Sequence, residues 1–230
     1  MQENIIKLSP RLFAIASLIK QDADIADIGS DHGHLPVYLA QIGLAKHIIA
    51  SDISAGSLRA AFKTAKKYDV FDKIIFKVTS GLDGIINTSI DTVVISGLGG
   101  ETIIEILSNA YRNIDENITF ILQPQTKIED LCAWLSEFGF VLSDARLVED
   151  NERIYLIMVV VLSKQEQIPK MTYYNLLSEL SQKNDPLFPK YIKNLIKKAK
   201  TSTDGLKISG SAGYFEAKNK LERLIEISQS

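Results

Sequence analysis

The chain has very little cysteine, histidine or tryptophan. Among its 230 residues there are one cysteine, three histidines and one tryptophan. A single thiol, Cys132, excludes an intramolecular disulfide and a multi-cysteine metal site, and we interpret it as a buried structural residue of an amphipathic helix. His32, His34 and His47 would need carboxylates from distant segments to complete a zinc site. We therefore expect no metal.

Long apolar runs are also missing. None approaches the ~20 residues that a membrane span needs, and the start, MQENIIKLSP, lacks the basic and then apolar plan of a signal peptide. We expect a cytoplasmic protein without membrane contact, and nothing in the sequence indicates an obligate protein partner.

The net charge of -2 conceals an asymmetry. Residues 1–162 hold 14 Lys and Arg against 21 Asp and Glu, whereas residues 163–230 hold 12 against 7. An acidic body thus carries a basic tail. The tail indicates an anionic partner, most commonly nucleic acid, although a solvated helical face has the same composition.

Short runs rich in Ile and Val alternate with helical segments through the acidic body. These runs predict buried strands at residues 25–28, 48–53, 74–78, 92–95 and 118–122. Ser9 and Pro10 favour a helix start, and further helices are expected at residues 35–43, 55–68, 101–112 and 127–138. The alternation predicts an α/β fold with a parallel sheet covered on both faces.

The end of the body has a different pattern. Residues 140–148 and 154–162 flank a polar turn and predict an antiparallel hairpin that completes the sheet. Residues 163–170 are interpreted as a linker, and the remainder predicts helices at 171–183, 187–200 and 212–228. We thus expect two domains, 1–162 and 163–230.

The most informative motif follows the first predicted strand, DIGSDHGHLP from Asp27 to Pro36. Gly29 and Gly33 allow a tight turn and close approach of a ligand at the edge where open α/β sheets bind cofactors. A dinucleotide site would favour Gly-x-Gly-x-x-Gly, and the carboxylate of Asp31 would repel a pyrophosphate. Asp27 and Asp31 better suit S-adenosylmethionine, which carries an ammonium and a sulfonium.

Further polar residues follow the next strands. Asp52 can accept both hydroxyls of a nucleoside ribose, although it can alternatively cap the next helix, a role open equally to Ser54. Ser80, Asp83 or a backbone amide of the loop at 80–84 can read an adenine edge, while Asp-Gly is also a common turn pair. The glycine-rich loop 96–100 and Gln123 are predicted to border the transferred methyl and the target base, with core packing and turn chemistry as the alternatives.

Taken together, these motifs resemble the bacterial tRNA adenine-22 N1-methyltransferase family over nearly the whole chain. The resemblance rests on LSPRL at 8–12, the loop 27–36, the loop 97–100, LQP at 122–124, and WL at 134–135. It extends through GF at 139–140, residues 149–155, and DPLF at 185–188. It implies a Rossmann-like domain that binds S-adenosylmethionine, and a C-terminal helical domain that helps to hold tRNA.

Three positions depart from the family pattern. The family usually has Tyr where His34 stands, Met where Leu98 stands and Asp where Ser80 stands. Leu for Met conserves volume, and His34 can still stack on a base or donate a hydrogen bond. Ser80 removes the carboxylate that would otherwise read the cofactor adenine.

The motifs and the resemblance together assign two sets of site residues. The cofactor is expected to lie against Arg11, Asp27, Gly29, Asp31, His32, Gly33, Asp52, Ile53, Ser80, Gly81, Leu82, Asp83 and Gly97. The catalytic set is expected to comprise Asp31, His34, Gly97, Leu98 and Gln123.

The expected chemistry relies on positioning. Adenine N1 has a lone pair and needs no activation, so its alignment with the methyl and sulfur should dominate catalysis, with the base leaving its stack to be reached. Asp31 is a candidate to orient the amino group or to take a proton later. Phosphates are expected on one basic helix, at Lys193, Lys197, Lys198 and Lys200.

Two other functions fit parts of the pattern. An NAD-linked oxidoreductase would use the same kind of sheet and a ribose-binding carboxylate. An RNA-binding module without catalysis would keep the basic tail. Cofactor binding and methyl transfer distinguish these alternatives from the methyltransferase.

Overall fold

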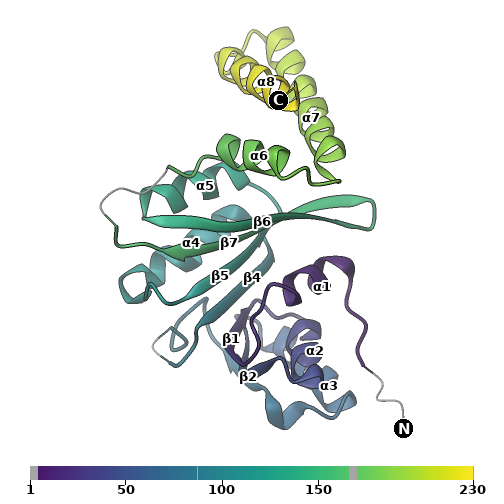
Figure 1. Cartoon of the computed structure of the whole chain (residues 1–230), viewed down its shortest axis with the longest axis vertical. Helices are drawn as coiled ribbons and strands as arrows, with labels where there is room; N and C mark the ends of the chain where they lie inside the picture. The colour runs from purple at the N-terminus through teal and green to yellow at the C-terminus, as the bar shows by residue number, and fades with distance from the viewer. Residues whose placement is uncertain (1–4, 87, 166–169, 230) are drawn as a thin grey trace. The chain divides into compact units, whose positions relative to one another are not determined.

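The computed structural model describes residues 5–86, 88–165 and 170–229. It divides into two compact units, Met1–Lys170 and Met171–Ser230 (Figure 1). Residues 166–169, which belong to the predicted linker, lie outside the described residues. No helix in the described part of the chain is both long and apolar enough to cross a membrane.

The first unit contains a seven-stranded sheet in the order β3-β2-β1-β4-β5-β7-β6. Its strands are β1 Ala23–Ile28, β2 Ala45–Asp52, β3 Ile75–Val78, β4 Thr92–Leu98, β5 Thr119–Pro124, β6 Phe140–Asp150 and β7 Arg153–Leu162. The first five are parallel, whereas β7 is antiparallel to both β5 and β6. This arrangement confirms the predicted parallel sheet with a terminal hairpin, because each Ile- and Val-rich run forms a strand.

Helices cover the sheet on both faces. They are α1 Pro10–Ala16, α2 His34–Ile42, α3 Ala55–Lys67, α4 Gly100–Ala110 and α5 Ile128–Glu137, with short 3-10 turns at Phe71–Lys73 and Tyr111–Asn113. The first three lie on one face, and α4 and α5 lie on the other (Figure 1). As predicted, Ser9 caps α1: its Oγ accepts the Leu12 amide at 3.4 Å, and Pro10 is the first helical residue.

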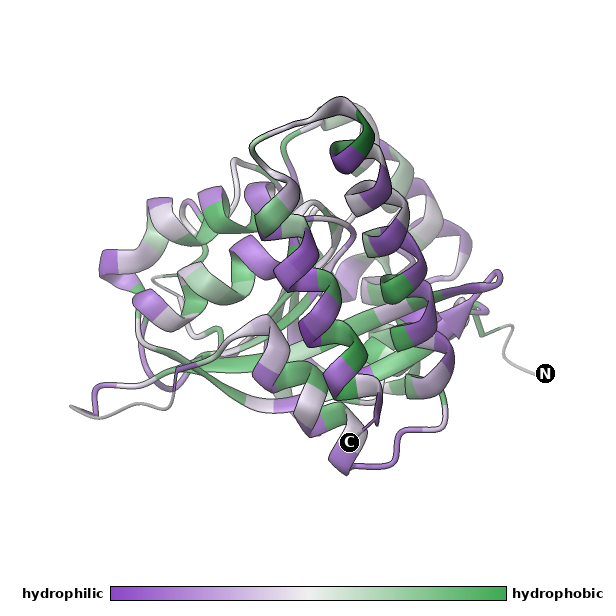
Figure 2. Cartoon of the chain, turned by 90° about the horizontal axis from the view of Figure 1, so that it is seen from above, coloured by the Kyte–Doolittle hydropathy of each residue, from purple (hydrophilic) through white to green (hydrophobic). Residues whose placement is uncertain are grey.

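The central strands are apolar because both of their faces are covered. Ile25, Val94 and Ile121 are fully buried in neighbouring parallel strands, and Figure 2 shows the strands coloured largely hydrophobic, whereas hydrophilic and hydrophobic residues alternate along the helices. Such a sheet forms a rigid platform, so the loops at the carboxyl ends of its strands are held in fixed positions.

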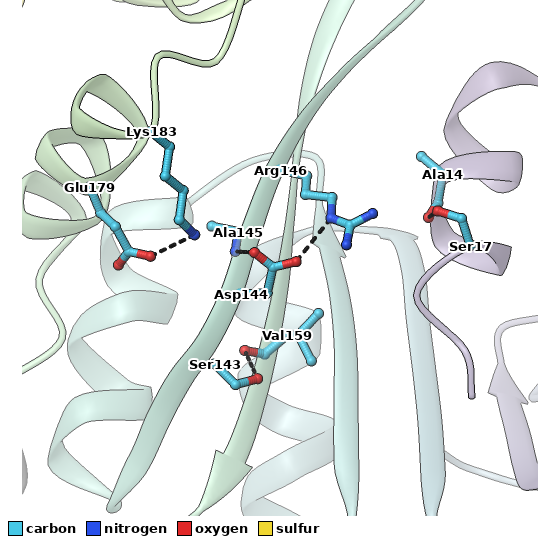
Figure 3. Close-up of polar contacts among 9 residues, drawn as sticks. All are labelled: Ala14, Ser17, Ser143, Asp144, Ala145, Arg146, Val159, Glu179 and Lys183. Atoms are coloured by element: carbon cyan, nitrogen blue, oxygen red, sulfur yellow. Dashed lines mark hydrogen bonds and ion pairs between the residues drawn. The ribbon is translucent and has the colours of Figure 1, made fainter. Parts of the chain in front are cut away.

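An irregularity in β6 shapes the hairpin. The register shifts between Leu142 and Asp144, and the Ser143 hydroxyl donates to the Val159 carbonyl at 3.1 Å. Asp144 accepts a hydrogen bond from the Ala145 amide and pairs with Arg146 at 2.9 Å (Figure 3). Such a bulge increases the local twist of the strand.

The second unit consists of α6 Tyr173–Gln182, α7 Phe188–Ser209 and α8 Tyr214–Gln229. The hydroxyls of Tyr173 and Tyr191 lie 3.2 Å apart, joining α6 to α7, and the Arg223 guanidinium of α8 stacks 4.5 Å from the centre of the Tyr174 ring. Glu179 and Lys183 form an ion pair at the end of α6 (Figure 3).

The sequence prediction ended the middle helix at residue 200, and this end was wrong. α7 continues to Ser209 and stops at Gly210, which adopts the left-handed conformation. The Thr201 and Thr203 hydroxyls donate to carbonyls one turn earlier, those of Lys197 and Ala199. These residues therefore continue the helix, and α8 packs along it.

Candidate active site

A cavity of about 650 Å³ opens at the carboxyl ends of the parallel strands. This is the edge where open α/β sheets bind ligands, and the volume is that of a small-molecule site. The cavity brings together most of the residues predicted from the sequence: Arg11, Asp27, Gly29, Asp31, His32, His34, Asp52, Ile53, Ser80, Gly81, Leu82, Gly97 and Leu98.

The loop after β1 forms the floor of the cavity. Gly29 has φ +73° and Gly33 has φ +69°, backbone conformations that favour glycine. The amides of Gly29 and Ser30 both donate to the Ser51 carbonyl at 2.9 Å, which fastens the loop to the end of β2. The Ser51 hydroxyl, in contrast, is buried without a hydrogen-bond partner among the described residues, and Ser51 lines the cavity.

Asp52 connects two parts of this wall. Its Oδ1 accepts the Ser54 amide at 2.8 Å, and its Oδ2 accepts the Asp31 amide at 3.2 Å. Ser54 itself caps α3, since its hydroxyl accepts the Gly56 and Ser57 amides. The capping role is thus filled by Ser54, and the Asp52 carboxylate remains at the cavity beside Ile53, whose exposed fraction is 75%.

Asp27 is the most perturbed acid of the cavity wall. Only 5% of the residue is exposed, and burial raises the pKa of its carboxyl to about 7. A hydrogen bond from Ser30 and the charge of Arg11 lower this pKa, whereas the charge of Asp52 raises it. A carboxyl that titrates near neutral pH binds a cation most strongly when it is deprotonated.

The two histidines of the loop lie side by side. The rings of His32 and His34 are 5.9 Å apart and stacked, and His32 lies 3.7 Å from the Asp31 carboxylate. Burial and the neighbouring His32 lower the pKa of His34 below its ordinary value. A neutral imidazole at the mouth of the cavity can stack on an aromatic base. No group of three possible metal ligands is found in the described part of the chain.

One wall of the cavity was missed in the sequence. Thr102, Glu105, Ile106 and Asn109 of α4 line it, at the spacing of one helical face. These residues form no motif of their own. Their only signal is that α4 begins directly after the glycine-rich loop of β4, which places its first turns over the same edge.

The buried side-chain amide of Gln123 holds together the β4 and β5 side of the cavity. Gln123 is fully buried at the end of β5. Its Oε1 accepts hydrogen bonds from Arg11 Nη1 at 2.8 Å and from the Gly97 amide at 3.1 Å, while its Nε2 donates to the Pro124 carbonyl at 3.0 Å. The guanidinium of Arg11 also lies 5.8 Å from the centre of the Tyr155 ring. The side chain of Gln123 thus links α1, the β4 loop and β5.

Three predicted site residues, Gly33, Asp83 and Gln123, are not among the residues that line the cavity, and their roles in the site stay predictions. Gly33 packs against α3, where an added Cβ would be 2.7 Å from Ala61 Cβ. Asp83 is part of a turn, in which its amide donates to the Ser80 carbonyl and its own carbonyl accepts from the Thr79 hydroxyl. Gln123 is enclosed by the hydrogen bonds above, and Gln125 lines the cavity instead.

Comparisons with known proteins agree with this geometry. Residues 8–158 match the family described as a methyltransferase domain. The tRNA (adenine(22)-N(1))-methyltransferase of Bacillus subtilis is 31% identical over 68% of this chain and 66% of its own length. A putative tRNA methyltransferase of Mycoplasma pneumoniae is 35% identical over 68% of this chain and 72% of its own length.

A solved structure agrees over a longer stretch. The structure of a putative tRNA (m1A22) methyltransferase of Streptococcus pneumoniae, in complex with S-adenosyl-L-methionine, covers 96% of this chain and 100% of its own, with a TM-score of 0.83 and 25% identity. Fold and cavity therefore define a Rossmann-like methyltransferase, which confirms the predicted fold class. Within that class, the chain belongs to the bacterial tRNA adenine-22 N1-methyltransferase family.

Proposed function

We propose that this protein transfers a methyl group from S-adenosylmethionine to N1 of an adenine in tRNA. The observation that carries the proposal is the cavity at the carboxyl ends of the strands, lined by the carboxylates of Asp27, Asp31 and Asp52. These anionic groups fit a nucleoside cofactor that carries positive charge. Family membership supports the same reaction, because its relatives are named as methyltransferases of tRNA.

The order of the strands suggests how the cofactor lies. Asp52, at the end of β2, can accept hydrogen bonds from the ribose hydroxyls, and the Ser80–Leu82 loop after β3 then adjoins the adenine. Asp27 and Gly97, at the ends of β1 and β4, adjoin the methionine part. The hydroxyl of Ser51, which has no hydrogen-bond partner in the part of the chain that the structure describes, offers one further hydrogen bond at the floor.

The same residues disfavour an oxidoreductase. A pyrophosphate would approach the loop of β1, where Asp27 and Asp31 are both acidic and Asp52 is adjacent. Repulsion between these charges opposes a dinucleotide, whereas the ammonium and sulfonium groups of S-adenosylmethionine are attracted. The carboxylates therefore favour the methyltransferase over the NAD-linked alternative.

Catalysis would depend mainly on position. The cofactor supplies an electrophilic methyl group on a positively charged sulfur, and adenine N1 already carries the lone pair that accepts it. We assign Gly97 and Leu98 to the wall beside the methyl group, and His34 to stacking on the target base. Asp31 would orient the base or accept a proton after the transfer. Alignment of reactants of this kind is worth up to roughly 7–11 kcal/mol.

We assign tRNA binding partly to the second unit, 171–230, as the RNA-binding domain. Lys193, Lys197, Lys198 and Lys200 are exposed on α7, whereas Ile192 is buried. Contacts of lysines with phosphates are strong and little dependent on sequence. Recognition of one adenine would then depend on RNA shape and on the cavity. A protein with this substrate would work in the cytoplasm.

The decisive experiment identifies the methylated nucleoside. The protein is incubated with radiolabelled S-adenosylmethionine and unmodified bacterial tRNA, and the RNA is digested to nucleosides. We expect label in 1-methyladenosine, and none with a transcript in which the target adenine is replaced by uridine. Cofactor binding without any labelled nucleoside would show that this chain acts on another substrate or only binds RNA.

A further inference from the structure

Gln125 is an exposed amide in the cavity wall, and its orientation is set by residues behind it. Its Nε2 donates to Gln123 Oε1 at 3.3 Å, and its own amide donates to the Leu98 carbonyl at 2.8 Å. Its Oε1 has no hydrogen-bond partner among the residues that the structure describes. Gln125 thus presents one defined polar atom at the β5 side of the cavity.

The hydrogen bonds of Gln123 fix which atom that is. Arg11 Nη1 and the Gly97 amide can only donate, so the atom of Gln123 that faces them must be the oxygen. The Pro124 carbonyl can only accept, so the atom facing it must be the nitrogen. The orientation of a side-chain amide is established by such a network.

The orientation of the Gln123 side-chain amide also determines that of Gln125. Because Gln123 Oε1 is an acceptor, the group of Gln125 that faces it at 3.3 Å is the NH₂ group, and the oxygen of Gln125 is then the outer atom. A rotated Gln125 would place its oxygen against the oxygen of Gln123 and lose the bond. The outer atom is therefore an acceptor and not a donor.

The position of this acceptor matches the substrate side of the cavity. In the proposed arrangement, the adenosine part of the cofactor lies at β2 and β3, and its methyl group adjoins Gly97 of β4. The next strand of the sheet, β5, then borders the tRNA base that receives the methyl group. An adenine that presents N1 also presents its 6-amino group, a donor, on the same edge. Guanine would present an oxygen there, which faces the Gln125 oxygen unfavourably.

We propose that the side-chain oxygen of Gln125 accepts a hydrogen bond from the 6-amino group of the target adenine and so selects adenine over guanine. This inference rests on the proposed function. When N1 bonds to the methyl group, the electrons of the broken carbon–sulfur bond stay on sulfur, and the adenine becomes positively charged. The 6-amino group shares that charge, so its bond to Gln125 strengthens during the reaction.

The test compares two tRNAs that differ only at the target base, which is adenine or unsubstituted purine. Purine keeps N1 but lacks the 6-amino group. Its N1 is intrinsically less reactive, and this affects every enzyme variant equally. The informative quantity is therefore the ratio of kcat/KM for adenine to that for purine, compared between the wild type and Gln125→Met, which has a similar volume without the amide.

We expect the ratio to be at least about tenfold larger for the wild type than for Gln125→Met, as for one hydrogen bond to a group that gains charge. Gln123→Met, which frees the Gln125 amide to rotate, should reduce the ratio as well. Gln21→Met is the matched control, because Gln21 precedes β1 at the opposite edge of the sheet, and among the described residues its side chain bonds only Asp22 and Gly43. Its ratio should equal that of the wild type.

A binding measurement supports the kinetic one. With S-adenosylhomocysteine present, removal of the 6-amino group should weaken tRNA binding a few-fold for the wild type and not for Gln125→Met. If the ratio of kcat/KM for adenine to that for purine is equal for the wild type and Gln125→Met, the inference about Gln125 is overturned, while the proposed methyltransferase function is unaffected. If the wild type fails to methylate the adenine tRNA, the proposed function fails first and the inference falls with it.

Discussion

The buried carboxyl of Asp27 should make the affinity of the cavity for the cofactor depend on pH. Its pKa is about 7 because it is buried near the end of β1. A positively charged cofactor binds the carboxylate better than the acid, so its affinity should rise with pH up to about 7 and level off above. Calorimetric titration of cofactor-free protein between about pH 5.5 and 8.5 measures this. Asp27→Asn should bind weakly and lose most of the pH dependence.

The carboxyl of Asp27 should also make the stability of the folded protein depend on pH. Stability should fall as pH rises, whereas cofactor affinity rises. Its folded pKa of about 7 lies above the ordinary value of 3.8, so the folded state binds more protons between these pH values. Its contribution to the free energy of unfolding then falls as pH rises through this window, by roughly 4 kcal/mol in total. Asp27→Asn should gain stability relative to the wild type at pH 8. An equal pH slope for both proteins in urea unfolding would contradict the raised pKa.

Asp52 is expected to contribute to affinity through both of its oxygens. Asp52→Ala removes the proposed ribose acceptor and releases the amides of Ser54 and Asp31. Loss of hydrogen bonds to a charged group costs about 1.5–3 kcal/mol, so the Kd for the cofactor should rise by roughly one to two decades. Asp72→Ala, an exposed acid of the 3-10 turn before β3, is the control. An unchanged Kd for Asp52→Ala would remove this residue from the site.

At the level of single residues, the sequence was informative where a residue type has few other uses. Asp27 and Asp52 lie at the ends of Ile-rich strands and Gly29 directly follows one, and the three residues lie together at the cavity. Gln123 and Gln125 could not be distinguished in this way, because both are amides beside Pro124. Hydrogen bonds from Arg11 and Gly97, which come from distant segments, decide which of the two is buried.

Among the helices, two glycines provide a matched pair of substitutions. An alanine Cβ at Gly100, the first residue of α4, would lie 2.4 Å from the Lys127 carbonyl oxygen, whereas Gly205 within α7 has open space around it. Gly100→Ala should destabilise the first unit by about 1–3 kcal/mol, because backbone must move. Gly205→Ala should stabilise α7 by up to about 1 kcal/mol.

Urea unfolding followed by circular dichroism measures both changes, and the opposite signs are the expected result. Since α4 carries the cavity residues Thr102 and Glu105, Gly100→Ala should also weaken cofactor binding, whereas Gly205→Ala should not. Destabilisation by Gly205→Ala would mean that α7 does not continue past residue 200, as the sequence first suggested.

The length of α7 shows that local helix propensity does not account for packing between helices. Residues 201–205 include two threonines, a serine and a glycine, which have low helix propensity, so the sequence favoured an earlier end. Packing along α8 outweighs this local preference. The strands were located more accurately, because burial on both faces requires the continuous apolar runs that the sequence displays.

Over the whole molecule, charge separates the two units, and this predicts how tRNA binding responds to salt. Lys193, Lys197 and Lys200 are exposed on α7 of the basic unit. Changing all three to Gln should weaken tRNA binding by about tenfold or more at physiological salt and should reduce the dependence of log Kd on log salt concentration by up to about three. Cofactor affinity should not change, because the cavity lies entirely within the first unit.

The matched control removes the same charge from another surface. Lys20, Lys46 and Lys73 are exposed near the amino ends of β1, β2 and β3, on the edge of the sheet opposite the cavity. Changing these three to Gln should leave the salt dependence of tRNA binding nearly unchanged. Equal losses for the two triple variants would mean that tRNA responds only to net charge, and that the α7 lysines form no specific phosphate-binding surface. A loss confined to the α7 variant would assign tRNA binding to the second unit and methyl transfer to the first.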